Sequence, residues 1–232
     1  MQIALDLGQS EAFIATRNRL LRLYDAVPYD SLSDPTDQLI ASILGSRTKD
    51  AVRRHAFAKL RSRYGVADLA DADPGEIQPL IAGVEFADKK AVDIVFALRR
   101  LKAISGGFSL EFLDGWNTLA ALRYLESFHG VGRKIAAAVV NFSTLRKPAL
   151  VMDTHVLRVL RRLGFLPAHI KDAGPAYDII MPSLMDWSAA DLHEFHWLLK
   201  HLGQDTCEAL RTNCRACPLE TLCQKRGVRT FH

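Results

Sequence analysis

Apolar side chains recur every three or four positions along most of the chain, which is the spacing of one face of an α-helix. No stretch keeps the strict alternation of a half-buried strand, and no segment is repeated in tandem. The pattern therefore predicts an all-α protein. Helices are predicted over residues 10–26, 34–44, 50–63, 74–82, 89–104, 118–127, 133–143, 153–163 and 188–203.

The ends of these helices coincide with residues that favour helix termini. Before several of them stands a side chain that can accept a hydrogen bond from a backbone NH group of the first turn. Asp73 and Glu76 have the spacing of a capping box, in which each side chain binds the backbone of the other residue. The predicted N-terminal caps are Ser10, Asp34, Asp73, Asn117, Asp153 and Ser188, and the predicted terminating glycines are Gly45, Gly106 and Gly164.

Length and composition allow one or two packed cores, because the chain has 232 residues, of which 49% are hydrophobic. The first residues, Met1 to Gly8, lack the basic start and apolar run of a secretory signal. No stretch approaches the roughly 18 consecutive apolar residues of a membrane span. We therefore expect a cytoplasmic protein without a membrane partner. Its net charge of +4 is compatible with a nucleic-acid partner but does not demonstrate one.

The four cysteines of the chain, Cys207, Cys214, Cys217 and Cys223, lie close together near its end. Three interpretations stay open: a disulfide pair, a structural zinc site and an iron–sulfur cluster. Only Cys214 and Cys217 form a C-x2-C pair, whereas four-cysteine zinc sites commonly use two such pairs, so the spacing favours the cluster. Arg211, Arg215, Lys225, Arg226 and Arg229 accompany the cysteines and form either a basic face for a nucleic acid or a solvated surface.

A second motif is the glycine-rich turn of residues 128–133, which leads directly into a predicted helix. Gly130 and Gly132 leave backbone NH groups at the positive end of that helix, where they can bind a phosphate. The same two glycines are also compatible with a plain tight turn. Lys134 follows within the first helical turn, beside Arg133. The positive surroundings favour a lowered pKa for this amine, as a nucleophile or Schiff-base former needs, although an ordinary surface lysine would have the same spacing.

Asp153 stands immediately before the helix that begins with Thr154, which is the position of an N-terminal cap. Capping by backbone NH groups keeps a carboxylate ionised, so that its free edge can stabilise a positive charge nearby. The spacing does not separate the structural role from the catalytic one.

Together, these motifs resemble the endonuclease III family of helix-hairpin-helix DNA repair glycosylases, which carry a [4Fe-4S] cluster. The resemblance rests on the segment from Leu125 to Lys134, the segment from Val151 to His155 and the four-cysteine loop, in that order. It implies two all-α domains with the active-site cleft between them. A six-helix barrel that includes the hairpin would cover residues 28–145, and a discontinuous cluster domain would combine residues 1–27 with residues 146–232.

The resemblance also implies a reaction and a role for each residue. Lys134 would attack the sugar, expel an oxidised pyrimidine and nick the strand by β-elimination from a Schiff base. Asp153 would stabilise the cationic sugar, and His155 would contact the DNA backbone or structure the site. Phosphates of double-stranded DNA would bind to Gly130, Val131, Gly132 and Arg133 and to Arg211 and Arg215, and the cysteines would hold the [4Fe-4S] cluster.

At three positions the chain departs from the family pattern. Arg47 stands where the family has a glutamine, Phe86 occupies the wedge segment, and His129 replaces the hairpin proline. The first two positions serve base eversion, in which side chains fill the gap left by the flipped nucleotide. The reaction type is therefore expected to be retained, while efficiency and substrate range are open.

Three other functions compete with this interpretation. A weakly active or catalytically idle lesion-binding paralogue would keep the hairpin and the basic loop. An adenine glycosylase would lack Lys134, and an electron carrier would leave the hairpin unexplained. We expect a monomer that acts on damaged or abasic double-stranded DNA and is associated with the nucleoid.

Overall fold

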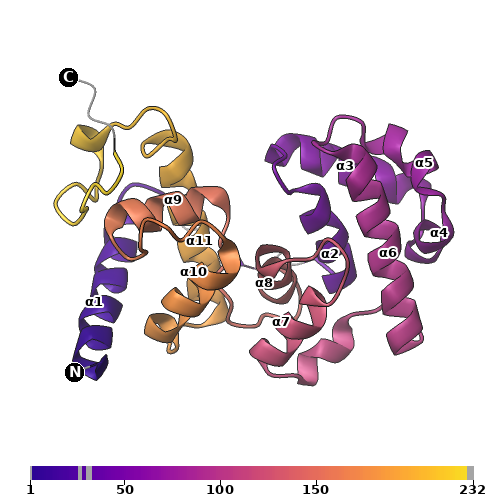
Figure 1. Ribbon diagram of the computed structural model, residues 1–232, viewed down its shortest axis with the longest axis horizontal. Coiled ribbons are helices and arrows are strands. Elements are labelled where there is room, and N and C mark those ends of the chain that lie inside the picture. The colour runs from indigo at the N-terminus through magenta and orange to yellow at the C-terminus, as the bar shows by residue number, and fades with distance from the viewer. Residues whose placement is uncertain (1, 26–27, 30–32, 229–232) are drawn as a thin grey trace. The chain divides into compact units, whose positions relative to one another are not determined.

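The computed structural model describes residues 2–25, 28–29 and 33–228 (Figure 1). Throughout these ranges the ordered elements are helices, and no strand is formed. Two isolated bridges, Ser33 with Ser143 and Cys207 with Thr212, are the β-type pairs recorded there. The predicted all-α class is therefore confirmed. Within the same ranges no helix is both long and apolar enough to span a membrane.

Eleven α-helices and four short 3₁₀-helices follow one another along the described chain. The α-helices are α1 (Gln2–Leu20), α2 (Pro35–Leu44), α3 (Asp50–Arg63), α4 (Val66–Asp71), α5 (Pro74–Ile77), α6 (Ala87–Ser105), α7 (Thr118–Glu126), α8 (Arg133–Asn141), α9 (Thr154–Leu163), α10 (Ala173–Ile180) and α11 (Ala189–Asp205). The 3₁₀-helices are η1 (Gln78–Ile81), η2 (Glu111–Gly115), η3 (Met181–Leu184) and η4 (Cys214–Ala216).

Most predicted caps are formed. Asp34 accepts hydrogen bonds from the backbone NH groups of Thr36 and Asp37 at 2.8 and 3.1 Å, and Pro35 opens α2. Asn117 accepts from Ala120 at 2.8 Å at the start of α7. These side chains satisfy backbone donors that have no acceptor within the helix, so they set where each helix begins. Gly106 and Gly164 end α6 and α9 in the left-handed conformation, with φ angles of 74° and 98°.

Two predicted helices differ from the observed ones. The first begins at Gln2 and not at residue 10, so Ser10 lies inside α1 and is not a cap, because the preceding residues are mostly good helix formers. The second, expected over residues 74–82, is split into α5 and η1. Pro79 lacks the NH group that would continue the α-helical bonding. Asp73 caps Gly75 at 2.6 Å, and a capping box with Glu76 does not take its place.

The chain divides into two compact units, one made of Met1–Ser31 with Lys147–His232 and the other of Leu32–Arg146. In the unit of Leu32–Arg146, α2 packs against α3, α6 and α8, and α7 packs against α8. The faces that meet are apolar, and the side chains of Leu39, Leu98 and Val139 are fully buried there. This packing determines where α8 begins, which is the end of the glycine-rich turn.

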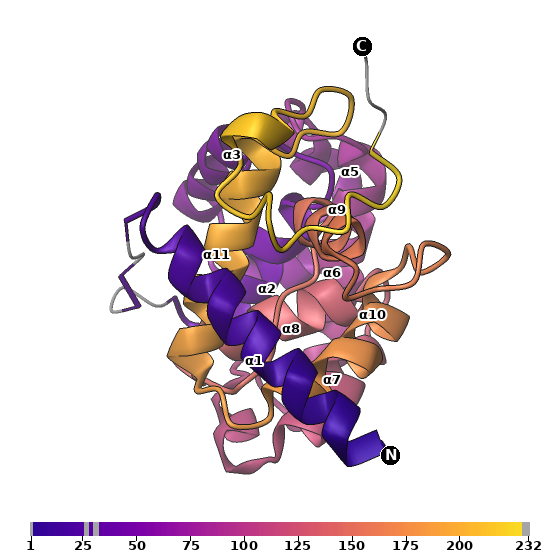
Figure 2. The ribbon, with the colours of Figure 1, turned by 90° about the vertical axis from the view of Figure 1, so that its left-hand side faces the viewer.

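In the other unit, α9 packs against α11, and α1 lies across α11 and η3, which Figure 2 shows from the side of α1. An aromatic group closes the core of this unit. The ring of Phe13 stacks on Phe165 with centroids 4.1 Å apart and meets Phe195 edge-on at 6.0 Å. Helix α1 therefore shares one core with residues from the C-terminal part of the chain.

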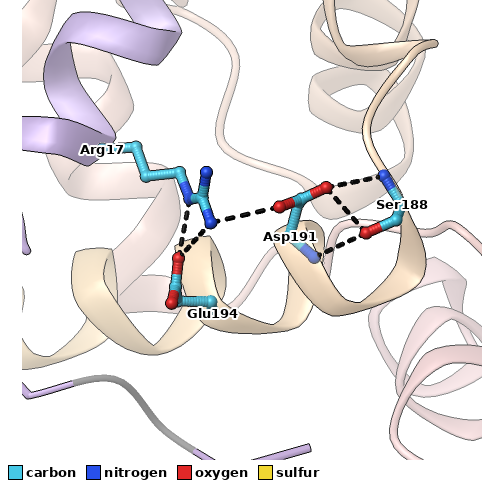
Figure 3. A network of polar contacts seen from close by, with 4 residues as sticks. All are labelled: Arg17, Ser188, Asp191 and Glu194. Carbon is cyan, nitrogen blue, oxygen red and sulfur yellow. Dashed lines mark hydrogen bonds and ion pairs between the residues drawn. The ribbon is translucent and has the colours of Figure 1, made fainter.

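A polar network also joins α1 to α11 (Figure 3). Arg17 lies 2.6 Å from Glu194 and 3.1 Å from Asp191. Asp191 accepts hydrogen bonds from the hydroxyl and the backbone NH of Ser188, at 2.6 and 3.0 Å, and Ser188 in turn accepts from the Asp191 backbone at 3.1 Å. Arg17, near the end of α1, thus binds the capping box at the start of α11 through Asp191 and binds the same helix again through Glu194.

The aromatic core predicts a contrast between two adjacent positions of α1. Phe13→Ala should lower the free energy of unfolding by about 3 to 5 kcal/mol, because Phe13 is fully buried between two rings. Ile14→Ala, at a side chain that is 47% exposed, should change it by about 0.5 kcal/mol or less. Urea unfolding followed by circular dichroism measures both; equal losses would contradict the assigned core.

Candidate active site and cysteine cluster

The glycine-rich turn is held against α6 by one buried carboxylate. The backbone NH of Val131 donates to the carbonyl of Phe128 at 3.1 Å, and Gly130 has a φ angle of 74°. A Cβ atom at residue 130 would lie 2.4 Å from the carboxyl carbon of Asp93. Both the backbone conformation and the close approach therefore require glycine at this position.

Asp93 has two polar partners, one on its own helix and one in the turn. Lys89 Nζ lies 2.7 and 3.0 Å from its oxygens, and His129 Nδ1 lies 2.9 Å from Oδ1. Only 4% of Asp93 is exposed, so these contacts compensate for the burial of its charge. His129, which departs from the family pattern, thus contributes a polar contact that a proline could not make. Asp93 was not found by sequence analysis, since an aspartate inside a helix carries no spacing signal.

Helix α8 begins directly after this turn. Gly132 is its cap residue, with no side chain to occupy the space in front of the first turn, and no atom lies within 4 Å of where a Cβ would stand. Arg133 Nε and Nη2 bind the two oxygens of Glu126 at 2.5 and 3.2 Å, which joins α8 to the end of α7. Lys134 is the second residue of the helix and lies half-buried at its positive end.

Arg47 and Phe86, which sequence analysis assigned to base eversion, lie together. The guanidinium carbon of Arg47 is 5.7 Å from the centre of the Phe86 ring, the distance of a cation–π contact. Both residues have left-handed backbones, with φ angles of 55° and 57°, which is uncommon for residues with a Cβ atom. They border a cavity of about 300 Å³ that is also lined by Ile43, Ser46, Lys89, Lys90, Asp93, Gly130 and Ile135.

Asp153 forms the predicted cap of α9. One of its oxygens accepts from the backbone NH groups of His155 and Val156, each at 2.8 Å. Burial acts to raise the pKa of Asp153, but the positive charge of His196, the Val156 NH and the charges of Lys200 and His155 together lower it. The carboxylate is therefore ionised at neutral pH although it is largely enclosed.

The groups behind Asp153 come from α11. His196 Nδ1 lies 2.8 Å from the carbonyl of Val151, two residues before the cap, and the Nζ of Lys200 lies 4.4 Å from the centre of the Trp197 ring. Trp197 donates its indole NH to His193 at 3.0 Å. Burial and the neighbouring His196 lower the pKa of His193 to about 4, so His193 is a neutral acceptor. His155, the predicted DNA contact, has Nδ1 3.1 Å from Arg158 Nη2.

The four cysteines are unpaired thiols that line one cavity, so the disulfide interpretation is not supported. Arg162 of α9 reaches this loop and donates to Cys207 Sγ at 3.2 Å and to the carbonyls of residues 207 and 208 at 2.9 and 2.6 Å. The backbone NH of Lys225 donates to Cys223 Sγ at 3.3 Å. Each of these donors favours the thiolate form of the sulfur that it contacts, which is the form that binds a metal centre, but at Cys223 burial outweighs the Lys225 NH and the pKa is raised.

Burial raises the pKa of Cys217 and of Cys223, and the negative charges of the neighbouring cysteines raise both further. A metal centre would relieve this repulsion, so the donor set fits a four-thiolate centre. In the part of the chain that the structure describes, no three cysteine, histidine or carboxylate side chains meet closely enough to hold one metal ion.

Arg211 and Arg215, predicted to contact the DNA backbone, are exposed on the cysteine loop. Lys225, by contrast, is paired with Glu220 at 2.9 Å. Arg229 lies outside the described residues. Lys134, Arg47, Phe86 and the turn belong to one compact unit, whereas Asp153, His155 and the cysteines belong to the other.

Comparison with known proteins explains why these features occur together. The family model described as "HhH-GPD superfamily base excision DNA repair protein" matches residues 40–187. The chain belongs to this superfamily. Endonuclease III of Escherichia coli K12 is 30% identical over 213 residues, covering 88% of this chain and 92% of that protein. Endonuclease III-like protein 1 of Gallus gallus is 28% identical and covers 84% of this chain and 67% of that protein.

Solved structures agree on the fold. The structure titled "Structure of a non-covalent Endonuclease III-DNA Complex" has a TM-score of 0.76 and 23% identity, and covers 93% of this chain and 95% of its own. A trapped endonuclease III–DNA covalent intermediate gives a TM-score of 0.75 at 24% identity, with coverage of 93% and 96%. The chain thus has the endonuclease III fold of the HhH-GPD superfamily. Its family and its relatives make it a DNA glycosylase/AP lyase of base excision repair.

The packing of the turn predicts a difference between its two glycines. Gly130→Ala should lower the free energy of unfolding by about 2 kcal/mol or more, because the left-handed backbone opposes a Cβ atom and Asp93 occupies its place. Gly132→Ala should change it by about 0.5 kcal/mol or less, since its φ of −98° suits any residue and its surroundings are open. Thermal or urea unfolding compares the pair, and equal stabilities would argue against the contact with Asp93.

Proposed function

We propose that this chain is a bifunctional DNA glycosylase that removes oxidised pyrimidines from duplex DNA and nicks abasic sites by β-elimination through a Schiff base on Lys134. The observation that carries the proposal is the position of Lys134. It is the second residue of α8, directly after a turn that requires glycine and is held by Asp93. An amine there can reach a sugar whose phosphate binds to the backbone of the turn.

The chemistry follows from an amine nucleophile. The neutral amine of Lys134 forms a bond to the anomeric carbon of the deoxyribose, and the bond to the damaged base breaks with its electron pair going to the base. Loss of the sugar ring oxygen from that carbon gives the Schiff base. Removal of a proton from the neighbouring sugar carbon then expels the 3′ phosphate, which nicks the strand, and water releases the lysine.

Asp153 supports this reaction as a carboxylate. The capping bonds from His155 and Val156 and its lowered pKa keep it charged at neutral pH. A fixed negative charge stabilises the positive charge that develops on the sugar as the base departs, and a carboxylate can accept the proton of the lysine. His155 would contact the DNA backbone beside it.

Base eversion is assigned to Arg47 and Phe86. The base must leave the duplex before the amine can reach the sugar, and inserted side chains stabilise the gap. Phe86 is 53% exposed and offers a flat apolar face, and the charge of Arg47 lies over that face. Phosphates of the DNA backbone would be bound at the turn of Gly130, Val131, Gly132 and Arg133, through charge and through backbone NH groups other than that of Val131, which donates to Phe128.

The cysteines at 207, 214, 217 and 223 would hold a [4Fe-4S] cluster with a structural role. The cluster would fix the loop on which Arg211 and Arg215 are exposed, so that both can contact phosphates. We assign the compact unit of Leu32–Arg146 to the barrel domain of the family, and the other unit to the cluster domain. The substrate would be damaged double-stranded DNA, bound by a monomer at the nucleoid.

Trapping with sodium borohydride tests the proposed amine. Borohydride reduces a Schiff base to a stable covalent bond, so the wild-type chain should be trapped on duplexes carrying an abasic site or thymine glycol. Lys134→Ala should lose trapping and strand nicking by at least about 10³-fold while keeping its fold. Lys59→Ala, an exposed lysine of α3, is the matched control and should react like the wild type. Cross-linked product is quantified on denaturing gels.

Comparing trapping on the abasic-site duplex with trapping on the thymine glycol duplex distinguishes the possible outcomes. Trapping by Lys134→Ala at the wild-type rate would refute the assignment of the nucleophile. Trapping of the wild type on the abasic site alone would retain the lyase and reject oxidised pyrimidines as substrates, which would point to Arg47 and Phe86. Binding without any trapping would indicate an idle lesion-binding protein.

If a cluster fixes the basic loop, losing the iron should also weaken DNA binding, whereas removing one arginine of that loop should weaken DNA binding without loss of iron. Wild-type protein purified without oxygen should contain about four iron atoms per chain. Cys217→Ala should lose the iron and most of its DNA affinity, because the basic loop is no longer fixed. Arg215→Ala should keep the iron but bind DNA more weakly, with a smaller dependence on salt. A Cys217→Ala protein that lost its iron and still bound DNA normally would contradict the structural role.

A further inference from the structure

Arg162 is a buried cation of α9 whose guanidinium is directed at the first cysteine of the loop. Only 8% of this residue is exposed. Its Nη1 lies 3.2 Å from Cys207 Sγ, 2.9 Å from the carbonyl of Cys207 and 2.6 Å from that of Glu208, and its Nη2 donates to the carbonyl of Ala209 at 3.2 Å. One side chain thus contacts a sulfur and three successive backbone carbonyls where the cysteine loop begins.

The backbone of Arg162 contacts the other end of the same loop. The last carbonyl groups of an α-helix have no donor within the helix. In α9, the carbonyl of Arg162 accepts from the backbone NH of Arg226 at 3.2 Å, and Cys223 Sγ lies 3.3 Å from it. Gly164 ends the helix, and a Cβ atom there would clash with the side chain of Gln224. The first and the last cysteine of the loop are therefore both held against the last turn of α9.

A guanidinium in this place has two physical effects on the loop. Without it, the carbonyls of residues 207–209 would lose a buried donor, and a buried polar group without its partner is costly. The second effect concerns the sulfur. Hydrogen bonds to the cysteine sulfurs are among the factors that set the reduction potential of an iron–sulfur cluster. A permanently charged donor at Cys207 Sγ stabilises the more negative, reduced state of such a cluster and so raises its potential.

Two neighbouring arginines of α9 differ from Arg162 in what they contact. Arg158 Nε donates to the carbonyl of Cys207 at 3.0 Å and thus supports the same backbone. Arg161 is half-buried, and its Nε donates to the carbonyl of Leu157 in its own helix at 3.3 Å. Arg161 therefore carries the same charge on the same helix, but its side chain is bound to that helix. This makes Arg161 the matched control for Arg162.

We propose that Arg162 is a positioning residue of the cysteine cluster, whose guanidinium holds Cys207 in place as a ligand and donates a hydrogen bond to its sulfur. The inference rests on the proposed [4Fe-4S] cluster and extends it to a residue that is not a ligand. The rate at which the cluster is lost and its reduction potential should then both depend on this side chain. A loop fixed by its four cysteines alone would show neither dependence.

Three variants, purified without oxygen beside the wild type, separate the guanidinium from its charge. Arg162→Met removes the donors and the charge, Arg162→Lys keeps a charge but offers one nitrogen in place of two, and Arg161→Met removes the neighbouring charge. Loss of the cluster to an iron chelator is followed by visible absorbance. Arg162→Met should lose its iron at least about tenfold faster than the wild type, because buried carbonyls lose their donor. Arg162→Lys should lie between the two, and Arg161→Met should behave like the wild type.

The reduction potential of the iron-loaded protein distinguishes a hydrogen bond to sulfur from support of the fold. It is measured by redox titration followed by electron paramagnetic resonance. Arg162→Met should have a lower potential than the wild type, because the reduced cluster loses a donor that stabilises it. Arg161→Met removes an equal charge from the same helix and should shift the potential less. A merely structural Arg162 would change the rate of iron loss and leave the potential unchanged.

A wild type without iron would overturn the proposed cluster and this inference together. With an iron-loaded wild type, an unchanged potential in Arg162→Met would overturn the inference alone, and so would an equal shift in Arg161→Met. If Arg162→Met does not fold, wild-type protein labelled with ¹⁵N-arginine takes its place. Electron–nuclear double resonance of the reduced cluster should then show a coupling to an arginine nitrogen that Arg162→Lys lacks. A wild type without that coupling would contradict the hydrogen bond to Cys207.

Discussion

The contacts of the buried Asp93 carboxylate govern the geometry of the candidate site. It occupies the space that a side chain at residue 130 would need, and it binds Lys89 of its own helix and His129 of the turn. The left-handed Gly130 and the start of α8 follow from that fit, and with them the position of Lys134. A carboxylate this deeply buried is stable only with such partners, so turn and helix depend on each other.

Lys90, which lines the same cavity as Asp93, is likewise a buried charge that depends on its polar partners. Three oxygen acceptors from the turn of Arg47 make its burial possible. The departures from the family pattern are therefore not isolated changes. Arg47 contacts Phe86, and His129 contacts Asp93, so each substitution has a partner in the same unit. This favours a rearranged site over a degraded one.

In the other unit, helix α9 lies between Asp153 at its start and the cysteine loop near its end. Asp153 caps its first turn, and Arg162 near its last turn holds the beginning of the cysteine loop. The packing of α9 against α11 brings His196 and Lys200 behind the carboxylate and keeps it charged. A rigid helix with a proposed catalytic group at one end and the cysteine loop at the other supports the structural role proposed for the cluster.

The sequence by itself determined the all-α class, most helix ends and the candidate residues Lys134, Asp153 and the four cysteines, because caps, glycines and ligand spacing act over a few residues. It missed α4 and α10, whose six and eight residues are too short for a clear period, and it placed the start of α1 at Ser10. Only the tertiary structure revealed Asp93, Lys90 and Arg162. Each acts on residues about 40 or more positions away in the chain, or on a turn packed against its helix, and the folded core alone brings such partners together.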